Sequence, residues 1–305
     1  MSYLPPDNLP APQPGQSEGL SPTPPPPAGP SEPAPEFRLG LQFDPQPIPD
    51  RPSRVDSRTP FHWMDLVYLM LFYFVSGGVL TLIVAAGAFV FFGISPSQLK
   101  TSTAAWASVM IITQALLSGA TLAFLYAVVR GRSAAPFWQV MGWRGFRNMA
   151  LSASVVLRYV FGGFALAVVV GWLGNFVGRE SGIPMEELFR SRQSVLMLMA
   201  LGILVAPLVE ETIFRGCIYP VIARKFGITT GIVATGALFG LAHAQQLGGA
   251  WGQIGLLICV GIVLTYIRAR AGTVAASYFV HLGYNTILFV GFFIATGGLR
   301  HLPTT

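Results

Sequence analysis

Beyond residue 60, the chain consists mainly of long apolar segments separated by short stretches that carry its basic residues. Each apolar segment is long enough for an α-helix to cross the core of a bilayer, which needs about 20 residues. The pattern predicts seven spans, at residues 64–92, 104–129, 152–177, 194–221, 228–246, 250–268 and 273–297. An eighth crossing would result if the unusually long first segment were bent at residues 76–78. The expected fold is therefore all-α, a polytopic transmembrane helical bundle.

Residues 1–60 have a different character, because they contain 18 of the 24 prolines and few aliphatic side chains. Such a segment cannot bury enough apolar surface to offset the entropy lost on ordering. We expect a disordered proline-rich tail at 1–60 and a transmembrane helical domain at 61–305. For this tail, we favour a solvated leader that binds no partner over a proline-rich segment that docks to one.

The composition supports an integral membrane protein and argues against other classes. Of the 305 residues, 52% are hydrophobic and 10% are charged, whereas about 25% are charged in an average soluble domain. The two cysteines, Cys217 and Cys259, lie in apolar segments, which predicts small buried side chains rather than a disulfide framework. No basic run interleaved with aromatic residues is present, so no nucleic-acid partner is expected.

Basic residues flank the predicted spans unevenly. With seven spans, the groups before the first span and after the second, fourth and sixth fall on one side. These residues are Arg51, Arg54 and Arg58, then Arg130, Arg132, Arg144 and Arg147, then Arg224 and Lys225, and finally Arg268 and Arg270. Because basic residues concentrate on the cytoplasmic side, we expect a cytoplasmic N-terminus and a multi-pass location in the cell membrane of a bacterium. Residues 136–149 predict an interfacial amphipathic segment.

Ionisable residues are rare inside the predicted spans. Of the six acidic residues after residue 60, only Glu210 and Glu211 lie well inside a span, and His243 and His281 are the two histidines within spans. Ionisable groups at membrane depth are costly and usually face a cavity or a partner. These four residues are therefore the first candidates for a functional site.

The spacing within LVEETIFRGC, residues 208–217, predicts different roles for the two adjacent glutamates. Glu211 and Arg215 are four residues apart, so they share a helix face and can neutralise each other. Glu210 points about 100° away around the helix and lacks a local cation, which suits a general base. A purely structural Glu211–Arg215 pair is an equally good interpretation and is compatible with a catalytic Glu210.

Two other predicted helices present side chains at the same spacing of four. Phe239 and His243 lie in FGLAH, and His281 and Asn285 lie in HLGYN. We expect these helices and the glutamate helix to enclose one polar pocket. Pro207 predicts a kink, or backbone carbonyl groups freed near that pocket.

At these residues the sequence resembles the CAAX prenyl protease and bacteriocin-processing family, known as CPBP or Abi. EETIFR at 210–215 is similar to the family's EExxxR motif, FGLAH at 239–243 to its FxxxH motif, and HLGYN at 281–285 to its HxxxN motif. The resemblance covers a CPBP-like catalytic core at about 130–297. It implies an all-helical intramembrane endopeptidase with a water-accessible cavity.

The resemblance also implies a role for each polar residue. Glu210 would activate water, assisted by His243. His281 and Asn285 would hold the water or stabilise the oxyanion. The supporting residues would be Glu211, Arg215 and Phe239.

Metal dependence stays open at this point. Glu210, His243 and His281 could form a zinc site with two histidines and one glutamate. No HExxH motif occurs, and the resemblance extends to both metalloproteases and metal-independent glutamate proteases. We expect no tightly held metal, with zinc as the alternative.

The substrate would be a membrane-associated peptide or protein, which could be prenylated. The long tail and short C-terminus differ from eukaryotic CAAX enzymes, so a bacteriocin precursor, a membrane-protein tail or a signalling partner is also open. One competing hypothesis is a non-catalytic immunity or scaffold protein of the same family, against which the intact motifs argue. Another is a proton-coupled transporter, but no internal repeat relates the two halves of the chain.

Overall fold

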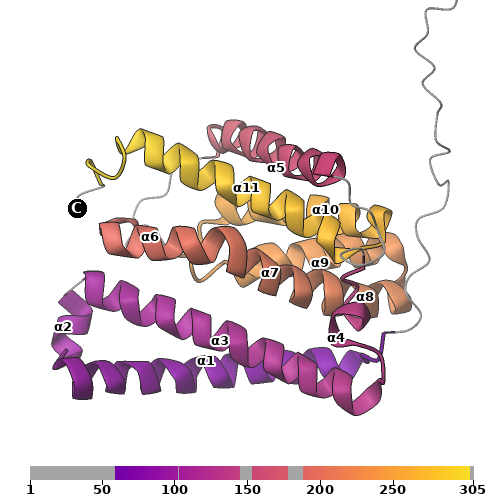
Figure 1. Cartoon of the computed structure of the whole chain (residues 1–305), viewed down its shortest axis with the longest axis horizontal. Coiled ribbons are helices and arrows are strands. Elements are labelled where there is room, and N and C mark those ends of the chain that lie inside the picture. Colours follow the sequence, from indigo (N-terminus) through magenta and orange to yellow (C-terminus); the bar gives the residue numbers. More distant parts are fainter. Residues whose placement is uncertain (1–58, 102, 145–152, 178–187, 303–305) are drawn as a thin grey trace, which may run out of the picture. The chain divides into compact units, whose positions relative to one another are not determined.

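The computed structural model describes residues 59–101, 103–144, 153–177 and 188–302, and every regular element in these ranges is a helix (Figure 1). The all-α prediction is therefore confirmed for the part of the chain that is described. The predicted tail at 1–60 lies outside it, apart from its last two residues.

Six helical segments are long and apolar enough to cross a membrane, which indicates a multi-pass integral membrane protein. They are α1 (Trp63–Phe92), α3 (Thr103–Arg132), α5 (Ala153–Gly174), the continuous run Arg192–Phe226, α10 (Trp251–Ala271) and α11 (Val274–Ala295). The remaining predicted span, at 228–246, is a shorter helix, α9 (Ile228–Ala242). Its 15 residues extend about 22 Å, which is less than a typical hydrocarbon core.

Two finer predictions differ from the structure, and a third falls partly outside the described residues. Helix α1 is continuous through residues 76–78, so no eighth crossing exists there. Gly77 lies against α3, where an added Cβ would meet Leu117 at 3.4 Å, so this glycine serves helix packing rather than a bend. Within 136–149, only the short helix α4 (Phe137–Val140) forms before residue 144, and 145–149 lie outside the described residues. Cys259 is exposed rather than buried, because it faces outward from α10.

The run Arg192–Phe226 alternates between α-helix and the wider π-helix. Its parts are α6 (Arg192–Ala200), η2 (Leu201–Val205), α7 (Ala206–Glu211), η3 (Thr212–Ile218) and α8 (Tyr219–Phe226). The two glutamates end α7, and the motif arginine lies in η3. π-Helical turns inside α-helices are rare and occur often at functional sites.

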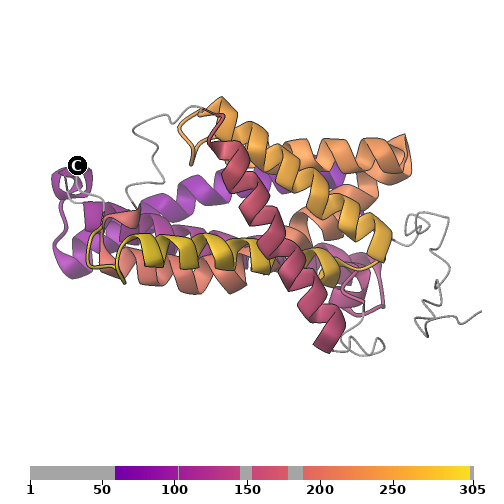
Figure 2. The ribbon, with the colours of Figure 1, turned by 90° about the horizontal axis from the view of Figure 1, so that it is seen from above.

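Glycine residues allow two pairs of helices to approach closely. A Cβ on Gly163 of α5 would lie 2.0 Å from the carbonyl oxygen of Val280, and one on Gly283 of α11 would lie 2.2 Å from that of Val160. Figure 2 shows this crossing of α5 over α11. Gly236 of α9 likewise faces the backbone of α10. Small residues at helix crossings are the usual means of close packing in membranes.

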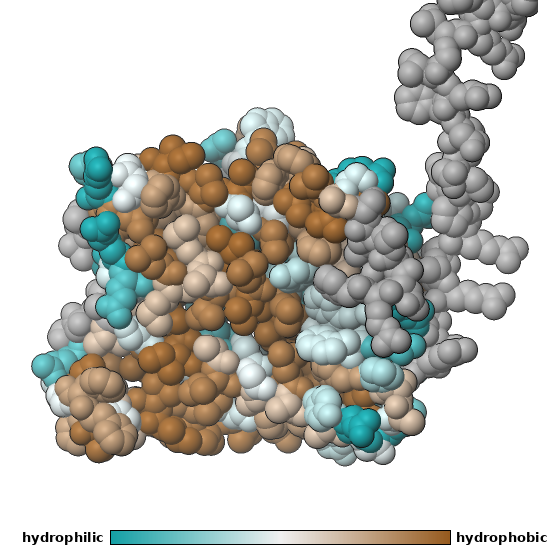
Figure 3. Space-filling model, in the orientation of Figure 1, coloured by the Kyte–Doolittle hydropathy of each residue, from teal (hydrophilic) through white to brown (hydrophobic). Residues whose placement is uncertain are grey.

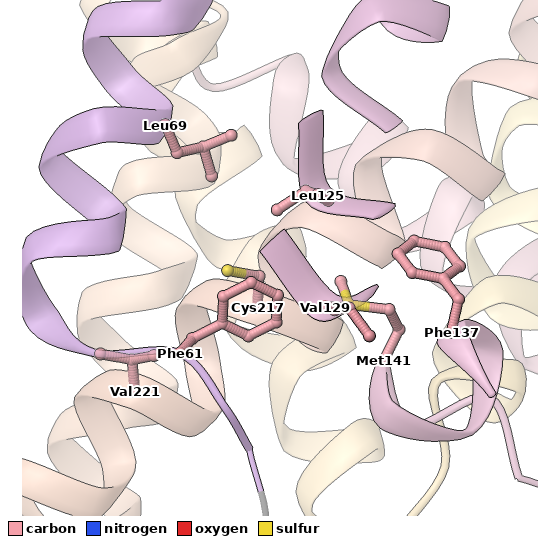
Figure 4. Close-up of a cluster of buried hydrophobic side chains, with 8 residues drawn as sticks. All are labelled: Phe61, Leu69, Leu125, Val129, Phe137, Met141, Cys217 and Val221. Carbon is pink, nitrogen blue, oxygen red and sulfur yellow. The ribbon is translucent and has the colours of Figure 1, made fainter. Parts of the chain in front are cut away.

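A hydrophobic cluster joins α1, α3, α4 and the run Arg192–Phe226 at one end of the bundle (Figure 4). Its members are Phe61, Leu69, Leu125, Val129, Phe137, Met141, Cys217 and Val221. Polar contacts hold the same end together, since Arg132 pairs with Asp65 at 2.5 Å and Arg224 donates to the carbonyl oxygens of Thr59 and Phe61.

These contacts agree with the prediction that the basic helix ends lie together on one side. The start of α1 and the ends of α3 and α8 meet there. The junction of α10 and α11 lies there too, because Val274 donates to the carbonyl oxygen of Gly142. On the face shown in Figure 3, hydrophobic residues occupy the middle and hydrophilic residues gather at its two ends.

Candidate functional site

The predicted ion pair between Glu211 and Arg215 is present and fully buried. Arg215 Nη1 lies 2.9 Å from Glu211 Oε1, and both side chains are 0% exposed. Arg215 Nη2 donates to the carbonyl oxygen of Gly261 at 3.0 Å, and Nε donates to Thr265 Oγ1 at 3.2 Å. The guanidinium also lies 4.6 Å from the ring centre of Phe239. All three nitrogens of this buried cation therefore have partners.

Glu211 also holds His281. The same carboxylate oxygen, Oε1, lies 2.9 Å from His281 Nδ1. A carboxylate paired with Arg215 is ionised and can only accept, so Nδ1 carries the proton and donates it. Nε2, on the other side of the ring, then faces Glu210, whose Oε2 is 3.8 Å away. In the neutral ring Nε2 is an acceptor.

Glu210 lies in different surroundings from its neighbour, as the helical spacing predicted. Its side chain is 27% exposed, whereas that of Glu211 is fully buried. It lies within electrostatic range of Tyr73 on α1, which lies close to Gln114 on α3. Sequence reasoning missed both residues, and a glutamine in the middle of an apolar span was the one available signal.

His243 directly follows the last residue of α9 and is fixed by that helix. Its Nδ1 lies 2.8 Å from the carbonyl oxygen of Phe239, which can only accept, so Nδ1 carries the proton and Nε2 is left as an acceptor. The buried ring of Phe239 lies 4.9 Å from the ring of His243 and 5.7 Å from that of His281. Phe239 thus contacts both histidines, while within the described residues His243 makes no hydrogen bond to Glu210.

Asn285 follows His281 by one turn of α11 and binds the irregular helix opposite. Its Nδ2 donates to the carbonyl oxygen of Gly202, in η2, at 2.7 Å. Pro207 lies five residues after Gly202 and has no N–H, so it cannot donate to this carbonyl in the π-helical pattern. The freed carbonyl expected from Pro207 is therefore present, and it positions Asn285. One N–H of the amide remains for another acceptor.

Trp143 connects the turn after α4 to the motif helix, which the sequence did not reveal. Its Nε1 donates to Thr212 Oγ1 at 3.0 Å, and that hydroxyl donates to the carbonyl oxygen of Leu208 at 2.7 Å. The indole also lies 5.4 Å from the ring of Tyr278 on α11. This side chain therefore braces the residue next to Glu211 against the helix that carries His281.

The alternative zinc site does not fit the observed arrangement. Among the residues that the structure describes, no three His, Cys, Asp or Glu side chains lie close enough together to hold a metal ion. We therefore derive the chemistry below from the side chains alone.

Comparison with known proteins agrees with the motifs. Residues 192–287 match the family described as type II CAAX prenyl endopeptidase, Rce1-like. This segment is an Rce1-like domain of the CPBP/Abi family. The Rce1-like domain begins with α6 and ends within α11, so it contains both glutamates, both intramembrane histidines and Asn285.

One curated relative is an uncharacterized 24.3 kDa protein from Escherichia coli. It is 28% identical over 130 residues, which represent 40% of this chain and 59% of that protein. The chain thus matches less than two thirds of that relative's length. No solved structure gives a significant match.

Proposed function

We propose that this protein is an intramembrane endopeptidase that hydrolyses a peptide bond of a membrane-associated substrate. The observation that carries the proposal is the position of His281 between two adjacent carboxylates, 2.9 Å from Glu211 and 3.8 Å from Glu210. One carboxylate is neutralised by a buried arginine, and the other is partly exposed and close to an imidazole. A partly exposed carboxylate of this kind can serve as a general base.

In the proposed reaction, Glu210 removes a proton from a water molecule as the water oxygen bonds to the scissile carbonyl carbon. The tetrahedral intermediate then collapses as the C–N bond breaks, and Glu210 returns the proton to the leaving amine. His243 helps to hold the water, because its Nε2 is an acceptor while Nδ1–H is fixed on its own helix.

The oxyanion would be stabilised by His281 and Asn285. Because Glu211 fixes Nδ1–H, His281 Nε2 can donate only when the ring is an imidazolium ion, which the carboxylate of Glu211 would stabilise. The neutral ring would instead accept a hydrogen bond from water. The N–H of Asn285 that Gly202 does not use is the second donor, and such preorganised donors contribute strongly to acyl-transfer catalysis.

For the substrate, we propose a peptide or protein tail held at the membrane. The description of the matched family is CAAX prenyl endopeptidase. For this chain, the need for a prenyl group is tested by comparing farnesylated and unmodified peptides. No nucleic acid is part of the proposal.

The proposal can be tested by cleavage of reporter peptides, farnesylated and unmodified, by the purified protein in liposomes. We expect Glu210→Gln to abolish cleavage and His243→Gln to reduce it by about 10²–10⁴-fold, the range for a group that assists proton transfer. The matched control is His301→Gln, because His301 is exposed near the C-terminal end of the chain.

A zinc chelator gives the second arm of this test. Cleavage that survives the chelator but not Glu210→Gln supports the glutamate base. Cleavage that the chelator abolishes and zinc restores would contradict the metal-free mechanism. Absence of cleavage across a broad peptide library would favour the non-catalytic immunity or scaffold hypothesis.

A further inference from the structure

A cavity lies at the basic end of the bundle, separate from the candidate active site. Its volume is about 290 Å³, and its lining residues are Trp63, Val221, Arg224 and Lys225. It joins the start of the first candidate span, Trp63–Phe92, to the end of the fourth, Arg192–Phe226. Helix ends with tryptophan and basic residues lie at the level of the lipid headgroups.

Within the described residues, the positive charge of Arg224 is not neutralised by its contacts. Its guanidinium donates to the carbonyl oxygen and the hydroxyl of Thr59, at 3.1 Å and 3.0 Å, and to the carbonyl oxygen of Phe61. All three acceptors are uncharged. By contrast, Arg132 at the same end is paired with the carboxylate of Asp65. Arg224 is therefore held in place at the cavity while its charge remains available.

In the described structure, Lys225 is also held in place without a neutralising carboxylate, but by contacts with aromatic rings. Its Nζ lies 5.3 Å from the ring centre of Trp63 and 5.1 Å from that of Phe226. Within the part of the chain that the structure describes, it forms no ion pair with a carboxylate. Contacts with two aromatic faces restrict the side chain and leave the ammonium N–H groups free to donate.

We propose that this cavity binds the phosphate group of an anionic glycerophospholipid. Two cations converge on one concave site, and none of its described lining residues is acidic, which makes the site complementary to a phosphate. The exposed faces of Trp63 and Phe226, 52% and 53% exposed, provide apolar surface beside it for the glycerol backbone and the first acyl carbons. The predicted orientation places this end at the cytoplasmic leaflet, where anionic lipids concentrate.

The test uses the full chain, purified in an uncharged detergent, with its thermal unfolding followed during titration with short-chain lipids. We expect phosphatidylglycerol to raise the unfolding midpoint in a saturable way. Phosphatidylcholine with the same acyl chains, and inorganic phosphate, should leave it unchanged. Lys225→Gln should weaken phosphatidylglycerol binding about fivefold, the effect of one basic residue near an anionic membrane surface.

Two further variants make this result specific. Lys225→Arg keeps the charge and should retain the affinity. Arg270→Gln removes an exposed cation near the end of α10 that does not line the cavity, and it should leave the affinity unchanged. Equal loss in Arg270→Gln would replace the proposed site by diffuse surface attraction. A full shift with phosphatidylcholine or with phosphate alone would overturn the assignment of an anionic lipid.

Discussion

Replacing Glu211 by glutamine isolates the charge of the buried carboxylate, because the two side chains have nearly the same shape. Arg215, which is 0% exposed, would lose the only anion that contacts it within the described structure. The guanidinium would still donate to Gly261 and Thr265, but both acceptors are uncharged. The variant thus leaves a buried cation without a counter-charge while most of its hydrogen bonds stay in place.

The expected cost differs sharply between the two adjacent glutamates. Removal of one partner from a buried ion pair costs about 3–5 kcal/mol. The carboxylate of Glu210 is partly exposed and lies 3.8 Å from His281, so its removal should cost about 0–1 kcal/mol. Each kcal/mol shifts the unfolding midpoint of a domain of this size by about 2–4 °C. We therefore expect a decrease of roughly 6–20 °C for Glu211→Gln and at most about 4 °C for Glu210→Gln.

The assay is thermal unfolding of the purified chain in one detergent, followed by circular dichroism. The set comprises wild type, both glutamine variants, Arg215→Met, and the double variant Glu211→Gln/Arg215→Met. The double variant should recover more than half of the loss in Glu211→Gln, because it no longer contains an uncompensated buried charge. The four proteins of the Glu211–Arg215 cycle give the coupling energy directly.

Two outcomes would refute this reasoning. One is a midpoint for Glu211→Gln that stays within about 2 °C of wild type, which corresponds to less than about 1 kcal/mol. The other is an equal loss in Glu210→Gln, which would show that the two carboxylates do not differ in their surroundings.

Two further predictions concern helix packing and a buried hydroxyl, and both are measured by the same unfolding assay. Gly163→Ala should cost about 1–3 kcal/mol, because the new Cβ would overlap the carbonyl oxygen of Val280, whereas Gly162→Ala, with no atom within 4 Å of the new Cβ, should be neutral or slightly stabilising. Equal effects of the two alanines would contradict the close crossing. Thr265→Val should cost about 1–3 kcal/mol because its hydroxyl accepts from the buried motif arginine, whereas Thr235→Val should be neutral or stabilising because the Thr235 hydroxyl is buried without a partner in the described structure. No loss of stability in Thr265→Val would show that this arginine does not depend on the hydroxyl.

Local spacing predicted the features that depend on one helix. The apolar segments gave the positions of the helices, because length and hydrophobicity alone decide whether a segment can cross a bilayer. The four-residue spacing predicted the Glu211–Arg215 pair, which the structure confirms at 2.9 Å. The chemical roles of Glu210, His243, His281 and Asn285 remain predictions for the cleavage assay.

Features that depend on contacts between helices could not be predicted in the same way. The sequence did not indicate that His281 would bind Glu211, since that choice depends on how α11 packs against α7. The span predicted at 228–246 was too long, because the helix ends at Ala242 and a turn follows. The π-helical turns around α7 have no sequence pattern of their own, although Pro207 pointed to their location.

The contact between Gly163 and Gly283 has a consequence for how substrates of different size could be accommodated. Gly283 follows His281 by two residues, and at this point the backbones of α5 and α11 touch. Two residues correspond to about 200° around a helix, so this contact lies on the side of α11 that faces away from His281. Touching backbones leave no side chain that could be repacked, so the contact fixes the position of α11. Adjustment would have to come from other helices, such as α1, whose Tyr73 lies within electrostatic range of Glu210 and close to Gln114 of α3. Those two helices lie outside the matched segment 192–287. We therefore expect related proteins to share the polar residues of the segment and to diverge in α1 and α3.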